Sequence, residues 1–147
     1  MSEVKLVEYG LRAAGTIRIV GDDFVVELID SNLAAQAQCI YAFLVGDEVV
    51  RVGSSQNPLR ARMHQWQRDV SKALKGLSSN TRPEEAAIWR ELLTGSYGRV
   101  FARMGFFAHS PLGTLNIFQV EEAALIAKFQ PRLCWDRTRH KNAKFSN

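Results

Sequence analysis

The sequence predicts a globular protein that combines antiparallel β-strands with amphipathic helices, and three stretches carry this prediction. Residues 39–55 hold two runs of β-branched and aromatic residues separated by turn formers, a pattern typical of a β-hairpin. Residues 16–29 repeat the pattern around Gly21 and predict a second hairpin. After Asn57, apolar side chains recur every three or four positions to about Leu77, which predicts a helix with one apolar face.

The composition indicates one ordinary globular domain without a membrane segment. With 147 residues, 46% of them hydrophobic and 23% charged, the chain is long enough to bury a core. No run is long and apolar enough to span a bilayer, and the N-terminus lacks the basic-then-apolar order of a secretory signal. We therefore expect a cytoplasmic location and a reduced state for the two cysteines, Cys39 and Cys134. A contact between their thiols is left open.

Charge is divided unevenly along the chain. Residues 1–50 contain three Lys or Arg and eight Asp or Glu, whereas residues 51–147 contain sixteen and seven. A basic half of this kind favours a polyanionic partner such as nucleic acid. The alternative is that the basic residues only keep a small domain in solution.

The register of the central hairpin decides which polar side chains share a surface. If three residues from Gly46 form its loop, Tyr41 faces Gly53 on the opposite strand. Tyr41 and Arg51 are then diagonal neighbours on one face, whereas a two-residue turn would place them on opposite faces. A polar pair there indicates a functional surface, and the alternative is a half-buried aromatic beside a solvated charge.

The helix after Asn57 carries an arginine at the edge of its apolar face. Arg62 lies one turn from Trp66, and a charge at this position needs a partner or must reach solvent along the surface. A second helix is expected between Pro83 and Gly95, because an anionic first turn precedes its apolar positions.

The last third of the chain predicts a strand, a loop and a helix. Residues 99–108 read as the strand and residues 109–113 as the loop, and Asn116 or Thr114 would cap the helix. Glu122 falls on the apolar face of this helix, whereas Glu121 is expected to stay in solvent. A carboxylate aimed at a core is unfavourable unless an arginine or a cation balances its charge.

The central hairpin resembles the GIY-YIG endonuclease family, which is named for tripeptides on two consecutive strands. Residues 39–41 read Cys-Ile-Tyr and residues 51–53 read Arg-Val-Gly, so each tripeptide departs from the family at its first position. The family continues with a small polar stretch and a helix that bears an Arg. Residues 54–57 and Arg62 match both features.

A further block lies near the C-terminal end of the chain. Residues 122–126 read Glu-Ala-Ala-Leu-Ile, similar to the family's Glu-x-x-Leu-Ile helix, and Pro131 follows as expected. Cys134 stands where the family has Asn, and Ser54 where relatives often carry Lys. Three blocks in the family's order, between residues 39 and 134, are more specific than either tripeptide.

The resemblance implies an α+β fold in which a small antiparallel sheet of about three strands is flanked by helices. It divides a single domain, residues 1–147, into three parts. These are an N-terminal hairpin extension (1–36), a GIY-YIG-like nuclease core (37–134) and a basic C-terminal tail (135–147).

The resemblance also implies hydrolysis of DNA phosphodiester bonds with one divalent ion, Mg²⁺ or Mn²⁺. On the motif positions, Tyr41 would activate water, Arg62 would stabilise the phosphorane and Glu122 would bind the metal. Arg51 would either hold phosphate or water in place of the missing Tyr, or pair with Glu122 where the metal would sit. The second alternative describes a catalytically degenerate nucleic-acid-binding module.

DNA is the expected partner, and no membrane contact is expected. Polar and basic side chains around the site and along the tail are the candidate DNA contacts. They are Ser54, Arg60, His64, Arg68, Arg132, Arg137, Arg139 and Lys141. Because no separate DNA-reading domain is present, specificity would come from loops, the extension, a homodimer or a partner protein.

Overall fold

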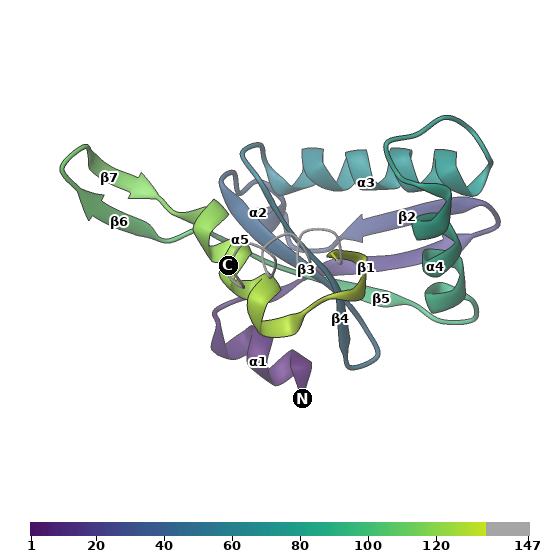
Figure 1. Ribbon diagram of the computed structural model, residues 1–147, viewed down its shortest axis with the longest axis horizontal. Coiled ribbons are helices and arrows are strands. Elements are labelled where there is room, and N and C mark those ends of the chain that lie inside the picture. Colours follow the sequence, from purple (N-terminus) through teal and green to yellow (C-terminus); the bar gives the residue numbers. More distant parts are fainter. Residues whose placement is uncertain (135–147) are drawn as a thin grey trace, which may run out of the picture.

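The computed structural model describes residues 1–134, and the three tail residues Arg137, Arg139 and Lys141 lie outside the described residues. A twisted sheet forms the centre, and helices cover both of its faces (Figure 1). The elements are α1 (Ser2–Glu8), β1 (Arg12–Val20), β2 (Asp23–Leu28), α2 (Ser31–Ala34), β3 (Cys39–Val45), β4 (Glu48–Ser55), α3 (Leu59–Leu74), α4 (Pro83–Leu93), β5 (Gly98–Met104), β6 (Phe107–Ser110), β7 (Gly113–Asn116), α5 (Phe118–Phe129) and the 3₁₀ turn η1 (Arg132–Cys134).

The main sheet is antiparallel and has five strands in the order β2-β1-β5-β3-β4. The α+β prediction is confirmed, but the sheet is larger than the expected three strands. The reason is that the N-terminal hairpin continues the sheet, because β1 pairs with β5 between Arg12 and Ile17. Strand β4 is left at the opposite edge.

The β3–β4 hairpin has the pairing expected for a three-residue loop, although its turn is shorter. The expectation that a two-residue turn would place Tyr41 and Arg51 on opposite faces is therefore wrong. The turn has two residues, and Gly46 adopts a left-handed φ of 60°. A β-bulge then shifts the pairing by one residue, so that Tyr41 still faces Gly53 and Phe43 still faces Arg51. The bulge therefore keeps Tyr41 and Arg51 on one face despite the short turn.

Two hydrophobic clusters lie on the two faces of the sheet. Tyr41 and Phe43 face α3 and α4, where Trp66 and Trp89 pack edge-on against the Phe43 ring. Ile40 and its neighbours on the other face pack against α1 and α5. The first face is called the α3 face below, and the second the α5 face. Every residue of β3 from 39 to 44 is buried, which explains its continuous apolar sequence.

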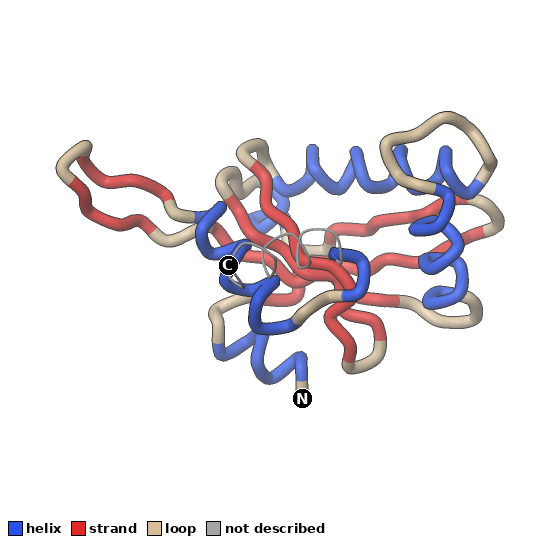
Figure 2. Tube along the Cα trace, in the orientation of Figure 1, coloured by secondary structure: helices blue, strands red, loops and turns tan. Residues whose placement is uncertain are grey.

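The expected long strand at residues 99–108 is interrupted. β5 ends at Met104, and a Cβ at Gly105 would lie 2.2 Å from the side-chain oxygen of Asn116. The following residues form a separate two-stranded sheet, β6–β7, which projects away from the body (Figure 2). The loop expected at residues 109–113 is therefore the turn of a hairpin, because Ser110 pairs with Gly113.

Helix α3 begins and ends close to its predicted limits. It starts at Leu59 with Pro58 as the N-cap residue, and its last turn closes three residues before the expected Leu77. A left-handed Gly76 follows, as is usual after a helix C-terminus. No helix in the described part of the chain has the length and apolarity needed to cross a membrane.

Candidate active site

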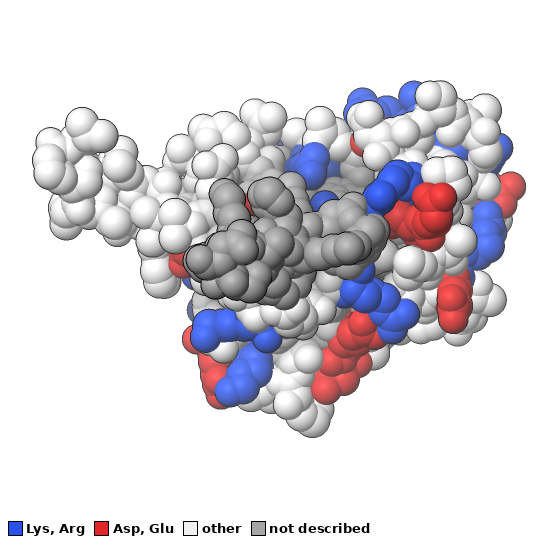
Figure 3. Space-filling model, viewed as in Figure 1, with Lys and Arg blue, Asp and Glu red and all other residues white. Residues whose placement is uncertain are grey.

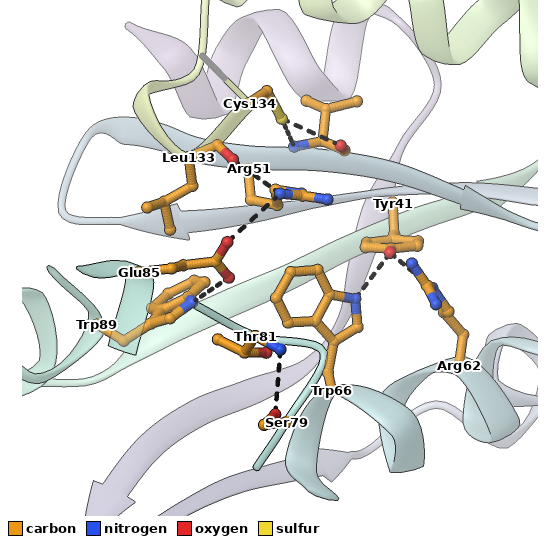
Figure 4. A network of polar contacts seen from close by, with 11 residues as sticks. Tyr41, Arg51, Arg62, Trp66, Ser79, Thr81, Glu85, Trp89, Leu133 and Cys134 are labelled. Carbon is orange, nitrogen blue, oxygen red and sulfur yellow. Dashed lines mark hydrogen bonds and ion pairs between the residues drawn. The ribbon is translucent and has the colours of Figure 1, made fainter. Parts of the chain in front are cut away.

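Tyr41 is the centre of a buried polar cluster on the α3 face. Its hydroxyl accepts hydrogen bonds from Trp66 Nε1 at 2.7 Å and from Arg62 Nε at 3.0 Å (Figure 4). The side chain is 0% exposed, and its ring packs over Gly53, where a Cβ would lie only 2.4 Å from the ring. The two N–H donors occupy both lone pairs of the hydroxyl oxygen, so the hydroxyl hydrogen must point away from Trp66 and Arg62.

Arg62 is held against Tyr41 by neutral groups. Its Nη1 donates to Gln65 Oε1 at 2.8 Å, and its guanidinium lies 5.9 Å from the centre of the Trp66 ring. Within the described residues its hydrogen-bond partners are a hydroxyl and an amide oxygen, and no carboxylate forms an ion pair with it. Among residues 1–134, the partners that the sequence analysis required for this charge are thus a phenol and an amide.

Trp66 is a site residue that sequence reasoning missed. Its position in the apolar stripe predicted only a core residue, yet its indole N–H holds Tyr41. The spacing could have revealed it, because residues four apart on a helix lie side by side and Arg62 precedes it by four.

Arg51 lies on the same face, beside Trp66, as the predicted register required. Its Nη1 donates to the backbone oxygen of Leu133 at 2.7 Å and lies 3.8 Å from Glu85 Oε1. The guanidinium stands 5.0 Å from the Trp66 ring centre, and its Nε is buried without a hydrogen-bond partner among the described residues. The ion-pair partner of Arg51 is thus Glu85, not Glu122.

Glu85 was also missed, because the anionic first turn to which it belongs indicated only where the second helix begins. The side chain is largely buried and has two partners, Arg51 and the indole N–H of Trp89 at 3.2 Å. Helix α4 therefore supplies the charge that fixes Arg51 (Figure 4).

Glu122 lies on the α5 face, where its carboxylate accepts a hydrogen bond of 2.9 Å from Ser54 Oγ. Ser54 pairs with Ile40, so its side chain points away from the face that carries Tyr41. The structure thus brings Tyr41, Arg51 and Arg62 together on one side of edge strand β4. It places Glu122 and Ser54 on the other side.

Glu121 differs from its expected exposure. It forms an ion pair with Arg103 in which both side chains are only 14% exposed, and it accepts a bond from the backbone N–H of Phe106. Burial alone would raise the pKa of Glu121, but these bonds outweigh it and hold the pKa below its usual range.

The described candidate DNA contacts lie on three elements: Arg60, His64 and Arg68 on α3, Ser54 on β4 and Arg132 on η1. Arg60 and His64 line a shallow groove between α3 and β2, and Arg68 pairs with its neighbour Asp69. Arg132 instead pairs with Glu48 at the start of β4. The hydrogen bond from this arginine holds the pKa of Glu48 below its usual range.

A polar pocket of about 190 Å³ opens beside Arg62 and Trp66. The loop between α3 and α4 forms its far wall. The lining residues are Arg62, Gln65, Trp66, Asp69, Asn80 and Thr81. The pocket gives a polar group from solvent a route to the guanidinium that covers Tyr41.

The donor set fits a magnesium ion that is held mainly by water and substrate. The described residues contain no group of three or more His, Cys, Asp or Glu side chains arranged to hold a metal. Mg²⁺ commonly binds through one or two carboxylates together with waters and phosphate oxygens, so the single carboxylate of Glu122 is a suitable donor.

The two cysteines lie in different core clusters, so the contact left open by the sequence is not formed. Burial raises the pKa of Cys39 to about 11, which keeps this thiol protonated. The Cys134 thiol bridges backbone groups of edge strand β4: it donates to Val52 O at 3.3 Å and accepts from Val52 N at 3.4 Å. These two hydrogen bonds connect η1 to strand β4.

The fold is shared with two structures of phage and restriction proteins. A point mutant of bacteriophage T4 EndoII superimposes with a TM-score of 0.64 and 21% identity, over 89% of this chain and 96% of that one. The restriction endonuclease HPY188I in complex with product DNA gives 0.53 and 14%, over 86% and 77%. No protein-family model and no curated protein matches the sequence. At these identities the likeness establishes the fold, and function must be argued from the site.

Proposed function

We propose that this chain is a GIY-YIG-type DNA endonuclease that uses a divalent ion to hydrolyse phosphodiester bonds. The observation that carries the proposal is the cluster of Tyr41, Arg62 and Trp66 beside a polar pocket. The shared fold with a restriction endonuclease solved with product DNA supports the same class.

Arg62 is suited to bind phosphate because nothing anionic must be displaced first. Its partners in the described chain are neutral, and it borders the pocket that leads to solvent. A guanidinium presents several N–H donors to phosphate oxygens, and it would stabilise the charge that develops on the phosphorane.

Tyr41 becomes accessible in this proposal only when substrate arrives. The phenol is fully buried in the structure and is bonded to Arg62 Nε. A phosphate that draws the Arg62 guanidinium into the pocket would uncover the oxygen, while Trp66 Nε1 keeps it in place. Once its own proton has passed to solvent, Tyr41 would take the proton from water as the water oxygen bonds to phosphorus and the bond to the leaving oxygen breaks.

Glu122 would hold the metal, with Ser54 Oγ orienting the carboxylate. A divalent ion bound there would stabilise negative charge on the leaving oxygen. Since Arg51 is held by Glu85 and Leu133, the guanidinium does not take the place of this ion. We assign Arg51 to the electrostatic support of bound phosphate.

The second candidate function is a nucleic-acid-binding module that does not cut. Two observations favour it: Tyr41 is fully buried, and Glu122 approaches β4 from the opposite face. In that case the basic side chains would bind the DNA backbone, and residues 39–41 and 51–53 would only stabilise the fold.

The test is cleavage of labelled single-stranded, duplex and branched DNA with Mg²⁺ or Mn²⁺, with and without chelator. Arg62→Ala is expected to slow cleavage about 100- to 1,000-fold, the usual effect of removing one group that stabilises transition-state charge. Glu122→Gln should remove the stimulation by metal. Arg18→Ala and Glu27→Gln are matched controls, because they alter an exposed ion pair on the β1–β2 hairpin.

Cleavage that is lost in both site variants and kept in both controls would support the endonuclease. Salt-dependent DNA binding without cleavage on any substrate or metal would reject it in favour of the binding module.

A further inference from the structure

Glu85 is a largely buried carboxylate at the edge of the candidate site. It lies in the first turn of α4, and its side chain is 18% exposed beside an Arg51 side chain that is 15% exposed. A carboxylate removed from water is unfavourable unless neighbouring groups balance its charge and accept its hydrogen bonds. The way in which its two partners are divided between its two oxygens therefore indicates what it does.

The carboxylate is hydrogen-bonded to a tryptophan and not to the arginine. Glu85 Oε2 accepts a bond of 3.2 Å from Trp89 Nε1, whereas Oε1 lies 3.8 Å from Arg51 Nη1, beyond hydrogen-bonding distance. Trp89 follows Glu85 by one helical turn, and its fully buried ring packs against Phe43. Helix α4 and the core therefore fix the place of the carboxylate without the help of Arg51 (Figure 4).

Arg51 is attracted by this charge while most of its N–H donors stay unused. Among residues 1–134 its guanidinium makes one hydrogen bond, from Nη1 to Leu133 O at 2.7 Å, although a guanidinium has five N–H donors. Its Nε is buried without an acceptor in the described chain. A carboxylate that served only to stabilise a buried arginine would accept two parallel hydrogen bonds from it. The observed arrangement leaves those donors for another anion.

A phosphate of the substrate is the anion that fits this place. The guanidiniums of Arg51 and Arg62 lie 5.0 and 5.9 Å from the centre of the same Trp66 ring, so both border one site. Phosphate oxygens match the geometry of guanidinium donors. Glu85 stands behind Arg51 as a fixed negative charge that such a phosphate would have to compete with.

We propose that Glu85 is a positioning residue for DNA cleavage, an inference that rests on the proposed function. Anchored to Trp89, its carboxylate keeps the Arg51 guanidinium in one place beside Trp66. It also weakens the attraction of Arg51 for bound phosphate, because a negative charge 3.8 Å away cancels part of the positive one. Binding that is equal in the ground state and the transition state does not speed the reaction. Glu85 thus lowers the affinity for DNA and raises the rate at which bound DNA is cut.

Two substitutions separate the charge of this carboxylate from its position. Glu85→Gln removes the charge and keeps the size, so it should bind duplex DNA about fivefold more tightly and cut bound DNA about tenfold more slowly. Glu85→Asp keeps the charge but is one methylene shorter, so it cannot keep both its bond to Trp89 and its distance to Arg51. It should bind within about twofold of wild type and also cut about tenfold more slowly.

Affinity and rate are measured separately, by fluorescence anisotropy of labelled duplex DNA in chelator and by single-turnover cleavage with Mg²⁺ at saturating protein. Figure 3 shows acidic side chains next to basic ones over α4, so the loss of any carboxylate there would strengthen DNA binding slightly. Glu84→Gln is the matched control, because Glu84 is exposed in the same turn of α4. Its affinity and rate should both stay within about twofold of wild type.

A double substitution tests whether Glu85 acts through Arg51. Glu85→Gln combined with Arg51→Gln should bind DNA no more tightly than Arg51→Gln alone, because the charge that the carboxylate restrains is gone. A further tightening of about fivefold in the double variant would overturn the inference.

Two other results would overturn it as well. Equal tightening in Glu84→Gln and Glu85→Gln would mean that only net charge matters. A lower free energy of unfolding in urea, with the affinity and rate of the folded protein unchanged in both Glu85 variants, would mean that the residue is purely structural.

DNA cleavage separates this inference from the proposed function. A wild-type protein that cuts DNA, with Glu85 variants that cut at the same rate, would reject the positioning role alone. A wild-type protein that binds DNA without cutting it would reject the endonuclease. Tighter binding by Glu85→Gln, absent from Glu84→Gln, would then still support the restraint of Arg51 by Glu85.

Discussion

Polar side chains lie on both sides of the sheet beside strand β4, and the two sides give them very different surroundings. On the α3 face, Tyr41 is fully buried, bonded to Trp66 and Arg62, and stacked over Gly53. On the α5 face, the Glu122 carboxylate is only half-buried and meets the hydroxyl of a strand residue.

Tyr41 is itself part of the core, whereas Glu122 is only half-buried, so changes at the two residues should affect stability differently. Changes around Tyr41 should lower activity and stability together, because its partners also form the core. Changes at Glu122 should affect activity with little effect on the free energy of unfolding.

The largest expected effect on stability is that of Trp66→Phe. The change removes a buried hydrogen bond to Tyr41 and part of a ring that packs against Phe43, so the free energy of unfolding should fall by about 2 to 4 kcal/mol. Urea unfolding would measure it. A loss below about 0.5 kcal/mol, the range of ordinary surface changes, would contradict the view that Tyr41 is held by its packing.

Gly53→Ala should lower the free energy of unfolding by about 2 to 3 kcal/mol, because the added Cβ would overlap the Tyr41 ring. Gln56→Ala, at an exposed site just after β4, is the control. Combining Gly53→Ala with Tyr41→Ala should cost less than the sum of the two single changes. Additive effects would mean that the ring does not fill the space above the glycine.

Tyr41→Phe and Glu122→Gln sharpen the comparison directly. Both should abolish cleavage under the proposed mechanism. Tyr41→Phe should also lower the free energy of unfolding by about 1 to 2 kcal/mol, since it leaves the buried Trp66 N–H and the partly buried Arg62 N–H without their acceptor. Glu122→Gln should stay within about 0.5 kcal/mol of wild type. Equal effects on stability would remove the distinction between the two faces.

The smallest effect concerns pH and the ion pair of Glu121 with Arg103. Because the folded pKa of Glu121 is lowered, its contribution to stability is full above the unfolded pKa and is lost as pH falls through the folded pKa. Glu121→Gln should therefore be less stable than wild type by about 1 kcal/mol at neutral pH, with a smaller difference near pH 3. Unfolding curves at both pH values would measure it, and a difference that does not change with pH would contradict this role.

Local patterns were sufficient to predict much of the fold and the positions of three candidate site residues, Tyr41, Arg51 and Arg62. The register drawn for a three-residue loop paired Tyr41 with Gly53, although the bulge that restores this pairing after a two-residue turn was not predicted. Helical spacing placed Arg62 at the edge of an apolar stripe. These properties depend on neighbours in the sequence, so a single chain reveals them.

Contacts between distant segments were not predictable in the same way. The bond from Trp66 to Tyr41 joins residues 25 apart, and Glu85 reaches Arg51 only because α4 packs on the sheet. The pairing of β1 with β5, which enlarges the sheet, likewise depends on which strand edges remain uncovered after folding. Apolar periodicity does not tell a core tryptophan from one that also donates a hydrogen bond.

The close approach of Tyr41 to Gly53 has a consequence for recognising distant relatives by their signatures. The glycine is required by the volume of the ring above it, whatever reaction the protein performs. A signature search that weights this glycine heavily will therefore retrieve chains with the same hairpin packing, including those that have lost catalysis. The position two residues before the glycine, occupied here by Arg51, is not restricted by the Tyr41 ring, so its side chain is the better guide to whether a relative works by the same chemistry.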